Sequence, residues 1–173
     1  GSIFFTDPPY GIINPKRVEG FPGKMMYGGC NVFKYEPKTK LLEALVTDME
    51  RPNGIALSPD ESQLFISNTG DTKYIRRYEI DKDLKISKPI EFAKSDPEHV
   101  FDGFRFDVDN NLWTSCGKGV ACYASSGEQI GYIKIPELVS NVDFGGAEGN
   151  TLFITASTSF YMANLNIKGA KFK

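Results

Sequence analysis

Short apolar runs recur along this chain, and one pattern of them appears four times. Each copy is a largely apolar run that ends in serine or threonine, and the copies occupy residues 3–6, 64–67, 112–115 and 152–155. Starts at 64, 112 and 152 give periods of 48 and 40 residues. Apolar runs of this length, without helical periodicity, are typical of β-strands. The repeat therefore predicts an architecture built from similar all-β units.

Further strands are predicted on both sides of each copy. Turns rich in Gly, Pro, Asn and Asp separate three of the copies from a preceding strand, which favours β-hairpins. The preceding strands are expected at 53–57, 102–106 and 141–144. Third strands, centred on aromatic residues, are expected at 32–35, 75–78, 120–123 and 160–161, and fourth strands at 41–46, 90–93 and 129–135. The repeating unit is thus a four-stranded antiparallel meander.

The repeated meander predicts a β-propeller, with about four four-stranded blades in this chain. The approximate blade boundaries are 1–50, 51–97, 98–138 and 139–173. The first blade lacks its first strand, and we expect residues 170–172 to supply the outermost strand of the last blade. Because a closed propeller usually needs more than four blades, we expect the C-terminal part of a larger ring. A β-sandwich also uses short strands, but it would not repeat its own sequence.

The composition argues against two classes of partner. The 173 residues carry a formal net charge of -2, with 20 Lys and Arg against 22 Asp and Glu. No basic cluster stands out, so we expect no nucleic-acid partner. The longest apolar runs are only as long as strands, so we expect no membrane-spanning segment. Nothing in the sequence indicates the oligomeric state.

Several features favour a cytoplasmic location. No signal peptide is visible, since the chain begins directly in a predicted strand, and no Asn-x-Ser/Thr glycosylation site is present. Cys30, Cys116 and Cys122 form an odd count without metal-type spacing. We expect these cysteines to be free thiols rather than a disulfide.

Three polar residues stand at matching positions in the repeat. Asn53, Asp102 and Asn141 begin the predicted first strands, which line the central channel of a propeller. Their oxygen atoms suit Ca²⁺, Mg²⁺ or Mn²⁺ better than zinc or copper. Gly54 and Gly103 would let the backbone pass close to a ligand. Alternatively, Asn-Gly and Asp-Gly are common hairpin dipeptides, and these residues would then form turns and bind nothing.

Four segments carry more specific motifs. They are Phe-Thr-Asp-Pro-Pro-Tyr-Gly at 5–11, Arg-Pro-Asn-Gly-Ile-Ala-Leu-Ser-Pro-Asp at 51–60, Asp-Gly-Phe-Arg-Phe-Asp at 102–107 with Asn-Leu-Trp at 111–113, and Phe-Gly-Gly at 144–146 with Thr-Leu-Phe-Ile-Thr at 151–155. Together they resemble the regucalcin/gluconolactonase (senescence marker protein) family of six-bladed β-propellers. The segments span nearly the whole chain in the family's order and spacing.

The resemblance implies a lactone hydrolase that depends on a divalent cation. Ca²⁺ is the first expectation, and Mg²⁺, Mn²⁺ or Zn²⁺ are the alternatives. In that family the Asn of the Pro-Asn-Gly motif and the Asp of the later Asp-Gly motif bind the metal, and these positions are Asn53 and Asp102 here. The same Asp is proposed as general base, so the resemblance makes Asp102 the catalytic candidate. A further metal-binding Glu and a second channel Asn of the family lie upstream of the residues in this chain.

Four other residues are candidate substrate contacts. Residues 8–31 form a long insertion of the kind that often covers a binding site, and it contains Tyr10 and Tyr27. The family's corresponding loop covers the channel mouth, although these tyrosines would also suit surface packing. His99 is the sole histidine and is either an acid/base at the channel rim, as in the paraoxonases, or an exposed loop residue. Asn141 either contacts substrate or a metal-bound water, or only satisfies backbone groups.

Two functions of different classes fit these observations. The first is a gluconolactonase-type hydrolase that opens a small-molecule lactone with a metal-activated water. The second is a propeller that binds Ca²⁺ or another ligand without catalysis, or an inactive fragment, which the upstream position of the family's metal-binding Glu favours. A strictosidine-synthase-like enzyme shares the architecture, but the Pro-Asn-Gly and Asp-Gly pair argues against it.

Overall fold

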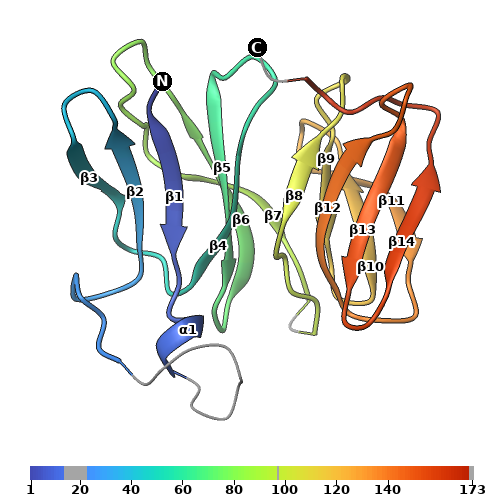
Figure 1. Cartoon of the computed structure of the whole chain (residues 1–173), viewed down its shortest axis with the longest axis horizontal. Coiled ribbons are helices and arrows are strands. Elements are labelled where there is room, and N and C mark those ends of the chain that lie inside the picture. Colours follow the sequence, from blue (N-terminus) through green and yellow to red (C-terminus); the bar gives the residue numbers. More distant parts are fainter. Residues whose placement is uncertain (14–22, 97, 172–173) are drawn as a thin grey trace.

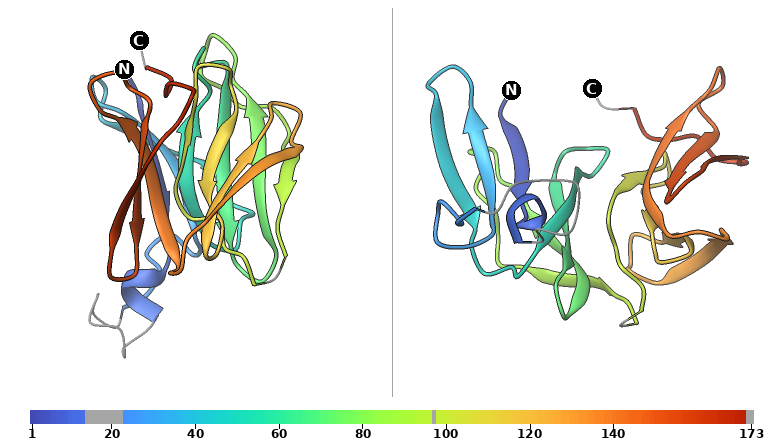
Figure 2. Two further views of the ribbon diagram at one scale, coloured as in Figure 1. Left: turned by 90° about the vertical axis from the view of Figure 1, so that its right-hand side faces the viewer. Right: turned by 60° about the horizontal axis from the view of Figure 1, so that its bottom comes forward.

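Four antiparallel sheets follow one another along the chain and stand side by side along an open arc (Figures 1 and 2). The computed structural model describes residues 1–13, 23–96 and 98–171. Within each sheet the strands are hydrogen-bonded in chain order, as the predicted meander requires. The meander is therefore confirmed.

The first sheet has three strands, β1 (Ile3–Asp7), β2 (Asn31–Glu36) and β3 (Leu41–Val46). The second has four, β4 (Pro52–Leu57), β5 (Gln63–Thr69), β6 (Lys73–Glu79) and β7 (Ile90–Lys94). The third has four, β8 (Phe104–Phe106), β9 (Leu112–Ser115), β10 (Gly119–Tyr123) and β11 (Gln129–Lys134). The fourth has three, β12 (Val139–Gly145), β13 (Thr151–Ala156) and β14 (Phe160–Asn164). One short helix, α1 (Tyr10–Ile13), follows β1.

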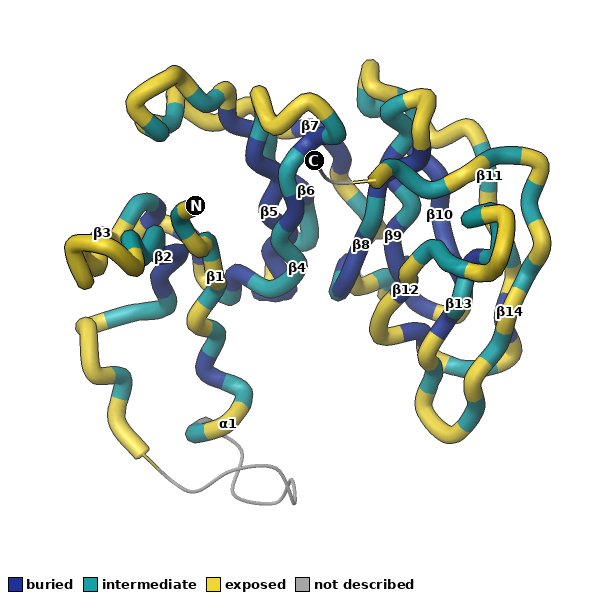
Figure 3. The backbone as a smooth tube through the Cα atoms, turned by 45° about the horizontal axis from the view of Figure 1, so that its top comes forward, coloured by how far each residue is buried: buried dark blue, intermediate teal, exposed yellow. Residues whose placement is uncertain are grey.

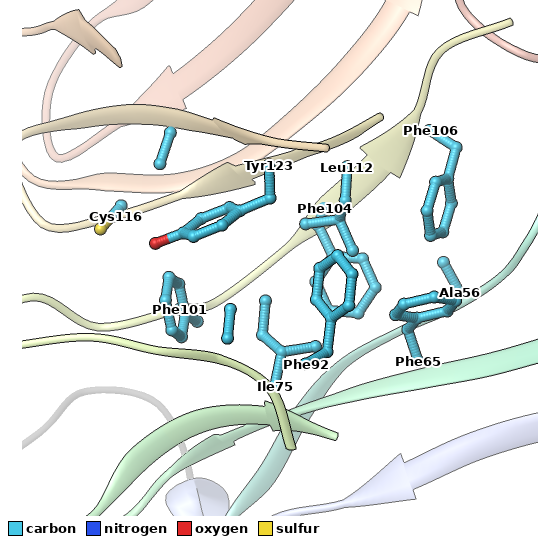
Figure 4. Packing of buried hydrophobic residues seen from close by; sticks show 12 residues of the cluster. Ala56, Phe65, Ile75, Phe92, Phe101, Phe104, Phe106, Leu112, Cys116 and Tyr123 are labelled. Carbon is cyan, nitrogen blue, oxygen red and sulfur yellow. The ribbon is translucent and has the colours of Figure 1, made fainter. Parts of the chain in front are cut away.

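Each pair of neighbouring sheets shares a hydrophobic core. In β5, Leu64 and Ile66 belong to the core against the first sheet, whereas Phe65 belongs to the core against the third sheet. Successive side chains of a strand point to opposite faces, so β5 is buried on both sides (Figure 3). In the second core, Phe65 packs edge-on against Phe92 and Phe106, with ring centroids 5.0 and 4.9 Å apart (Figure 4). Face-to-face packing of successive sheets is what a propeller requires.

The strands β4, β8 and β12 lie on the inner side of the arc (Figure 3). Each begins at the same end of the molecule, where α1 also lies at the bottom of Figure 1. We call this end, formed by α1 and the segments 47–51, 95–96, 98–103 and 135–138, the mouth end. The opposite end carries the turns between the first two strands of each unit. The arrangement places the polar residues predicted for the channel together at the mouth end.

The C-terminal tail contradicts one prediction. Residues 170–172 were expected to form the outermost strand of the last sheet, but β14 has no such neighbour among the described residues, and Phe172 lies outside them. Instead the tail turns back to the third sheet, where Gly169 forms a bridge with Asp107. The backbone N–H of Ala170 donates to the carbonyl of Phe106 at 2.9 Å. Gly169 also donates to Gly149, so backbone hydrogen bonds hold the tail along the turns of two sheets.

The outward faces of the first and last sheets are apolar and exposed. On β1, Ile3 and Phe5 alternate with residues that face the second sheet. On β14, Phe160 and Met162 are 64% and 73% exposed. These faces are equivalent to those that neighbouring sheets cover elsewhere in the arc.

Candidate functional site

Asn53 and Asp102 meet at the mouth end, where the Asn53 side chain lies close enough to the Asp102 carboxyl group to lower its pKa. Asn53 is the second residue of β4, and Asp102 lies two residues before β8. The repeat predicted matching positions for the two residues, and their positions relative to the strands differ. Both residues nevertheless belong to neighbouring inner segments of the arc. The structure brings these two predicted site residues together.

The environment of Asp102 disfavours its charge. The carboxyl group is largely desolvated, and burial raises its pKa, while the Asn53 side chain opposes this rise. In the described part of the chain no basic side chain forms an ion pair with Asp102. A desolvated carboxylate beside an amide, without a basic partner, has the donor chemistry that a hard divalent cation prefers.

The glycines after these residues allow neighbouring inner segments to pack closely, because a side chain at either position would collide with the next segment. A Cβ on Gly54 would lie 1.9 Å from the carbonyl oxygen of Asp102, and one on Gly103 would lie 2.0 Å from the side-chain oxygen of Asn141. Neither glycine has a positive φ. The Asn-Gly dipeptide lies inside β4 rather than in a hairpin turn. The turn interpretation is therefore wrong for Asn53-Gly54, and at both glycines the next inner segment lies where a Cβ would be.

Two buried serines hold the backbone of Asp102. Its N–H donates to Ser115 Oγ at 2.9 Å, and its carbonyl accepts a hydrogen bond from Ser67 Oγ at 3.1 Å. Both serines are fully buried and come from different sheets. They are the hydroxyl residues that end two of the four repeated apolar runs. The sequence contained this signal, but its role in holding the candidate site was not predicted.

The same type of contact occurs one sheet earlier. Thr6, which ends the first repeated apolar run, donates to the carbonyl of Asn53 at 2.7 Å. The hydroxyl of one sheet thus reaches the inner segment of the next in two places, through Thr6 and Ser67. In the fourth sheet, Thr155 instead donates to Asn141 in its own sheet at 3.3 Å.

Asn141 lies next to the pair without joining it. Its side chain packs against Gly103, and its Oδ1 accepts a hydrogen bond from the backbone N–H of Val142 at 2.8 Å. The residue is exposed, and in the described structure no hydrogen bond links it to Asp102. These contacts satisfy a backbone group, which was one of its two predicted roles.

The two tyrosines of the insertion lie in different places. The Tyr10 hydroxyl on α1 hydrogen bonds with the Thr69 hydroxyl at the end of β5, so Tyr10 reaches the mouth end of the second sheet. Tyr27 packs edge-on against Phe33, with ring centroids 5.3 Å apart, and lines a hollow of about 340 Å³. Phe33 alternates with Val32, which faces the second sheet, so Tyr27 lies on the opposite face of the first sheet. The structure does not bring Tyr27 to the Asn53–Asp102 pair.

His99 is half-buried in the segment between β7 and β8, at the mouth end. Its ring lies against Gly117 in the turn between β9 and β10. Its backbone N–H donates to the carbonyl of Asp96 at 3.0 Å, and its own carbonyl accepts a hydrogen bond from Ser95. Among the described residues no hydrogen bond joins its imidazole to Asp102. The contacts of His99 fix the loop rather than identify an acid/base.

Other chemistry is limited in the part of the chain that the structure describes. Within it, no three His, Cys, Asp or Glu side chains gather closely enough to hold a metal ion. Cys30, Cys116 and Cys122 are free, as predicted. Burial raises the pKa of Cys116 to about 11 and that of Cys122 to about 12, which keeps both as thiols. No helix in the described residues has the length and apolar character needed to cross a membrane.

Comparison with known proteins identifies close relatives. The gluconolactonase of Zymomonas mobilis subsp. mobilis is 35% identical over 167 residues, which cover 91% of this chain and 45% of that protein. The crystal structure of a putative gluconolactonase matches with a TM-score of 0.88 and 35% identity, over 99% of this chain and 57% of that one. A gluconolactonase from Xanthomonas campestris matches with a TM-score of 0.84 and 32% identity, over 98% of this chain and 54% of that one.

The chain therefore spans about half the length of these relatives. The fold prediction of an all-β propeller, only part of whose blades are present, is confirmed by the structural matches. The family model of the SMP-30/gluconolactonase/LRE-like region matches residues 1–158. The repeat, the paired channel residues and these matches agree, and the chain belongs to the SMP-30/gluconolactonase/LRE-like family.

Proposed function

We propose that this chain belongs to a lactone hydrolase of the gluconolactonase type that uses a divalent cation held by Asn53 and Asp102. The observation that carries the proposal is their meeting at the mouth end, where Asp102 is desolvated and forms no ion pair with a basic side chain of the described residues. The relatives named gluconolactonase support a sugar lactone as the substrate class. Because the chain spans about half of their length, the activity of the whole protein is part of the proposal.

The residues have separate roles in this mechanism. When bound, a divalent cation polarises the lactone carbonyl and lowers the pKa of a coordinated water. Asp102 accepts a proton from the attacking water as general base. The burial that raises its pKa also makes its carboxylate a stronger proton acceptor. Asn53 lies beside this carboxyl group and offers its own side-chain oxygen to the cation.

The donor set favours a hard cation. Asn53 and Asp102 supply an amide and a carboxylate, and in the described structure no His or Cys side chain joins them. Oxygen donors of this kind suit Ca²⁺, with Mg²⁺, Mn²⁺ and Zn²⁺ as the alternatives. Calcium is therefore our proposed ion.

Lactone hydrolysis tests the assignment. Turnover of gluconolactone, followed with a pH indicator, is expected to disappear with a chelator and to return with added Ca²⁺. Asp102→Ala is expected to abolish turnover, and Asn53→Ala is expected to weaken Ca²⁺ binding. Asp109→Ala is a matched control, because Asp109 is an exposed carboxylate in the turn at the opposite end of the third sheet. Turnover retained by Asp102→Ala would reject the mechanism.

A second candidate function is cation binding without hydrolysis. It is favoured by the small number of ligands, since only two candidate oxygen-bearing side chains meet in the described structure. Calorimetric titration with Ca²⁺, beside the turnover assay, separates the two functions. Binding without turnover of any lactone tested would favour this candidate.

A further inference from the structure

One hydroxyl group connects the two candidate ligands. Ser67 Oγ accepts a hydrogen bond from the backbone N–H of Gly54, directly after Asn53, at 2.7 Å. The same Oγ donates to the backbone carbonyl of Asp102 at 3.1 Å. A serine hydroxyl has one proton to donate, and that proton is used on Asp102. Ser67 thus joins the backbones that carry both candidate ligands, although it is neither a ligand nor a charged group.

No strand ladder replaces this connection. Asp102 precedes β8, and the partners of its N–H and carbonyl are the hydroxyls of Ser115 and Ser67. Gly54 lies in the irregular part of the β4–β5 pairing, where the register shifts between Pro52 and Ile55. The relative position of these two backbone segments therefore depends on side-chain hydrogen bonds.

The position of the Ser67 hydroxyl is itself well defined. Ser67 is fully buried, and it follows Leu64, Phe65 and Ile66, which are packed in two different cores. Thr6 makes the equivalent contact with Asn53 from the preceding sheet, so the geometry occurs twice and is compatible with threonine.

We propose that Ser67 is a positioning residue that sets the separation and orientation of Asn53 and Asp102 for a shared divalent cation. The inference rests on the proposed function, because it concerns how the same site is held. Residues that orient metal ligands through hydrogen bonds typically change metal affinity by about 10–100-fold when they are removed. Loss of the Ser67 hydroxyl should therefore weaken cation binding without removing a ligand.

The test compares three variants of the protein by calorimetric titration with Ca²⁺ alone, without substrate. Ser67→Ala is expected to lower the Ca²⁺ affinity at least about tenfold. Ser67→Thr, which copies the residue at the equivalent position 6, is expected to keep the affinity closer to the original, with a loss below the roughly tenfold lower limit for removal of the hydroxyl. Ser58→Ala is the matched control, because Ser58 is a buried serine of the same sheet that donates to Asp60 and accepts from Gln63 at the opposite end.

Amide hydrogen exchange of Gly54 supplies a readout that does not depend on the cation. The Gly54 N–H is expected to exchange faster in Ser67→Ala than in Ser58→Ala, because only the first variant removes its acceptor. If Ser67→Thr does not fold, the comparison of the two alanine variants still decides. Equal Ca²⁺ affinity in Ser67→Ala and the original protein, or an equal loss in both alanine variants, would overturn the positioning role.

The two possible failures are distinguishable. An original protein that binds none of Ca²⁺, Mg²⁺, Mn²⁺ or Zn²⁺ rejects the proposed function, and the positioning role falls with it. An original protein that binds Ca²⁺, together with a Ser67→Ala variant that binds it equally well, rejects only the positioning role.

Discussion

At the scale of single residues, close approach explains the most specific motifs of the chain. Gly54 and Gly103 follow Asn53 and Asp102 because another inner segment occupies the space of their missing side chains. The Asn-Gly and Asp-Gly dipeptides thus mark a contact between neighbouring sheets. Sequence reasoning about hairpin turns could not identify these contacts, because they join residues 48 and 38 positions apart in the chain, about one repeat period.

Gly54→Ala tests this explanation. The added Cβ would meet the carbonyl oxygen of Asp102, so we expect a loss of about 1–3 kcal/mol in the free energy of unfolding, typical of overpacking. Gly131→Ala is the control, because its Cβ would meet nothing closer than Cys122 at 3.5 Å. Urea denaturation followed by circular dichroism measures both. Equal midpoints for the two variants would contradict the explanation.

At the scale of elements, the repeat predicted the strands well and the connections poorly. The strand β3 matches its predicted range, 41–46, and β7 and β11 differ from theirs by one residue at one end. Strands are set by local apolar patterns, which one sequence displays. The path of the tail along Asp107 depends on backbone hydrogen bonds between distant segments, which leave no such pattern.

The candidate site shows the same division. Asn53 and Asp102 could be predicted, because the repeat and the family motifs mark them. The contacts of Ser67 could not be predicted, although a serine or threonine ends all four repeated apolar runs, because its two partners belong to different sheets. Tyr27, for which both pocket lining and surface packing were predicted, packs against Phe33 on the outward face of the first sheet.

One carboxylate ties together the loops of the last two sheets. Glu137, between β11 and β12, accepts hydrogen bonds from the Ser159 hydroxyl, the Thr158 backbone N–H and the Tyr161 hydroxyl. These hydrogen bonds, that from Ser159 most strongly, lower the pKa of Glu137 to about 2. A carboxyl group whose pKa is lower in the folded state stabilises the fold above its unfolded value, here 4.5, and this contribution is lost as the pH falls toward about 2.

Glu137→Gln is therefore expected to lower the denaturation midpoint at pH 7. The difference from the original protein should shrink as the pH falls from 4.5 toward 2, because the original Glu137 is then protonated as well. Thermal unfolding across this pH range measures the effect. Glu128→Gln is the control, because the exposed Glu128 side chain makes no hydrogen bond among the described residues. A difference that stays constant with pH would contradict the assignment.

At the scale of the whole molecule, the outward faces of the end sheets differ from the sheet faces that pack against a neighbouring sheet. The inner sheets bury both faces, whereas Phe160 and Met162 on β14 and Ile3 and Phe5 on β1 remain exposed. A contiguous exposed apolar surface commonly promotes association. The arc thus leaves exposed apolar side chains on the outward faces of both end sheets of the 173-residue chain.

Phe160→Lys combined with Met162→Lys is expected to reduce self-association of the 173-residue chain with little loss of stability, because both side chains are more than half exposed. Static light scattering over a range of protein concentrations measures the association. Val108→Lys is the control, since Val108 is also exposed but lies in the turn between β8 and β9. An original chain that remains monomeric at all concentrations would contradict this prediction.

The double burial of β5 has a consequence for mutagenesis. Leu64 and Phe65 face different cores, and the same strand carries Ser67 two residues later. A cavity created on either side of β5 can shift the strand, and the shift is transmitted along rigid backbone to the inner edge of the arc. Distance from the proposed cation site is then a poor guide to which substitutions weaken cation binding. Screens for altered cation specificity should therefore include this strand as well as the loops of the mouth end.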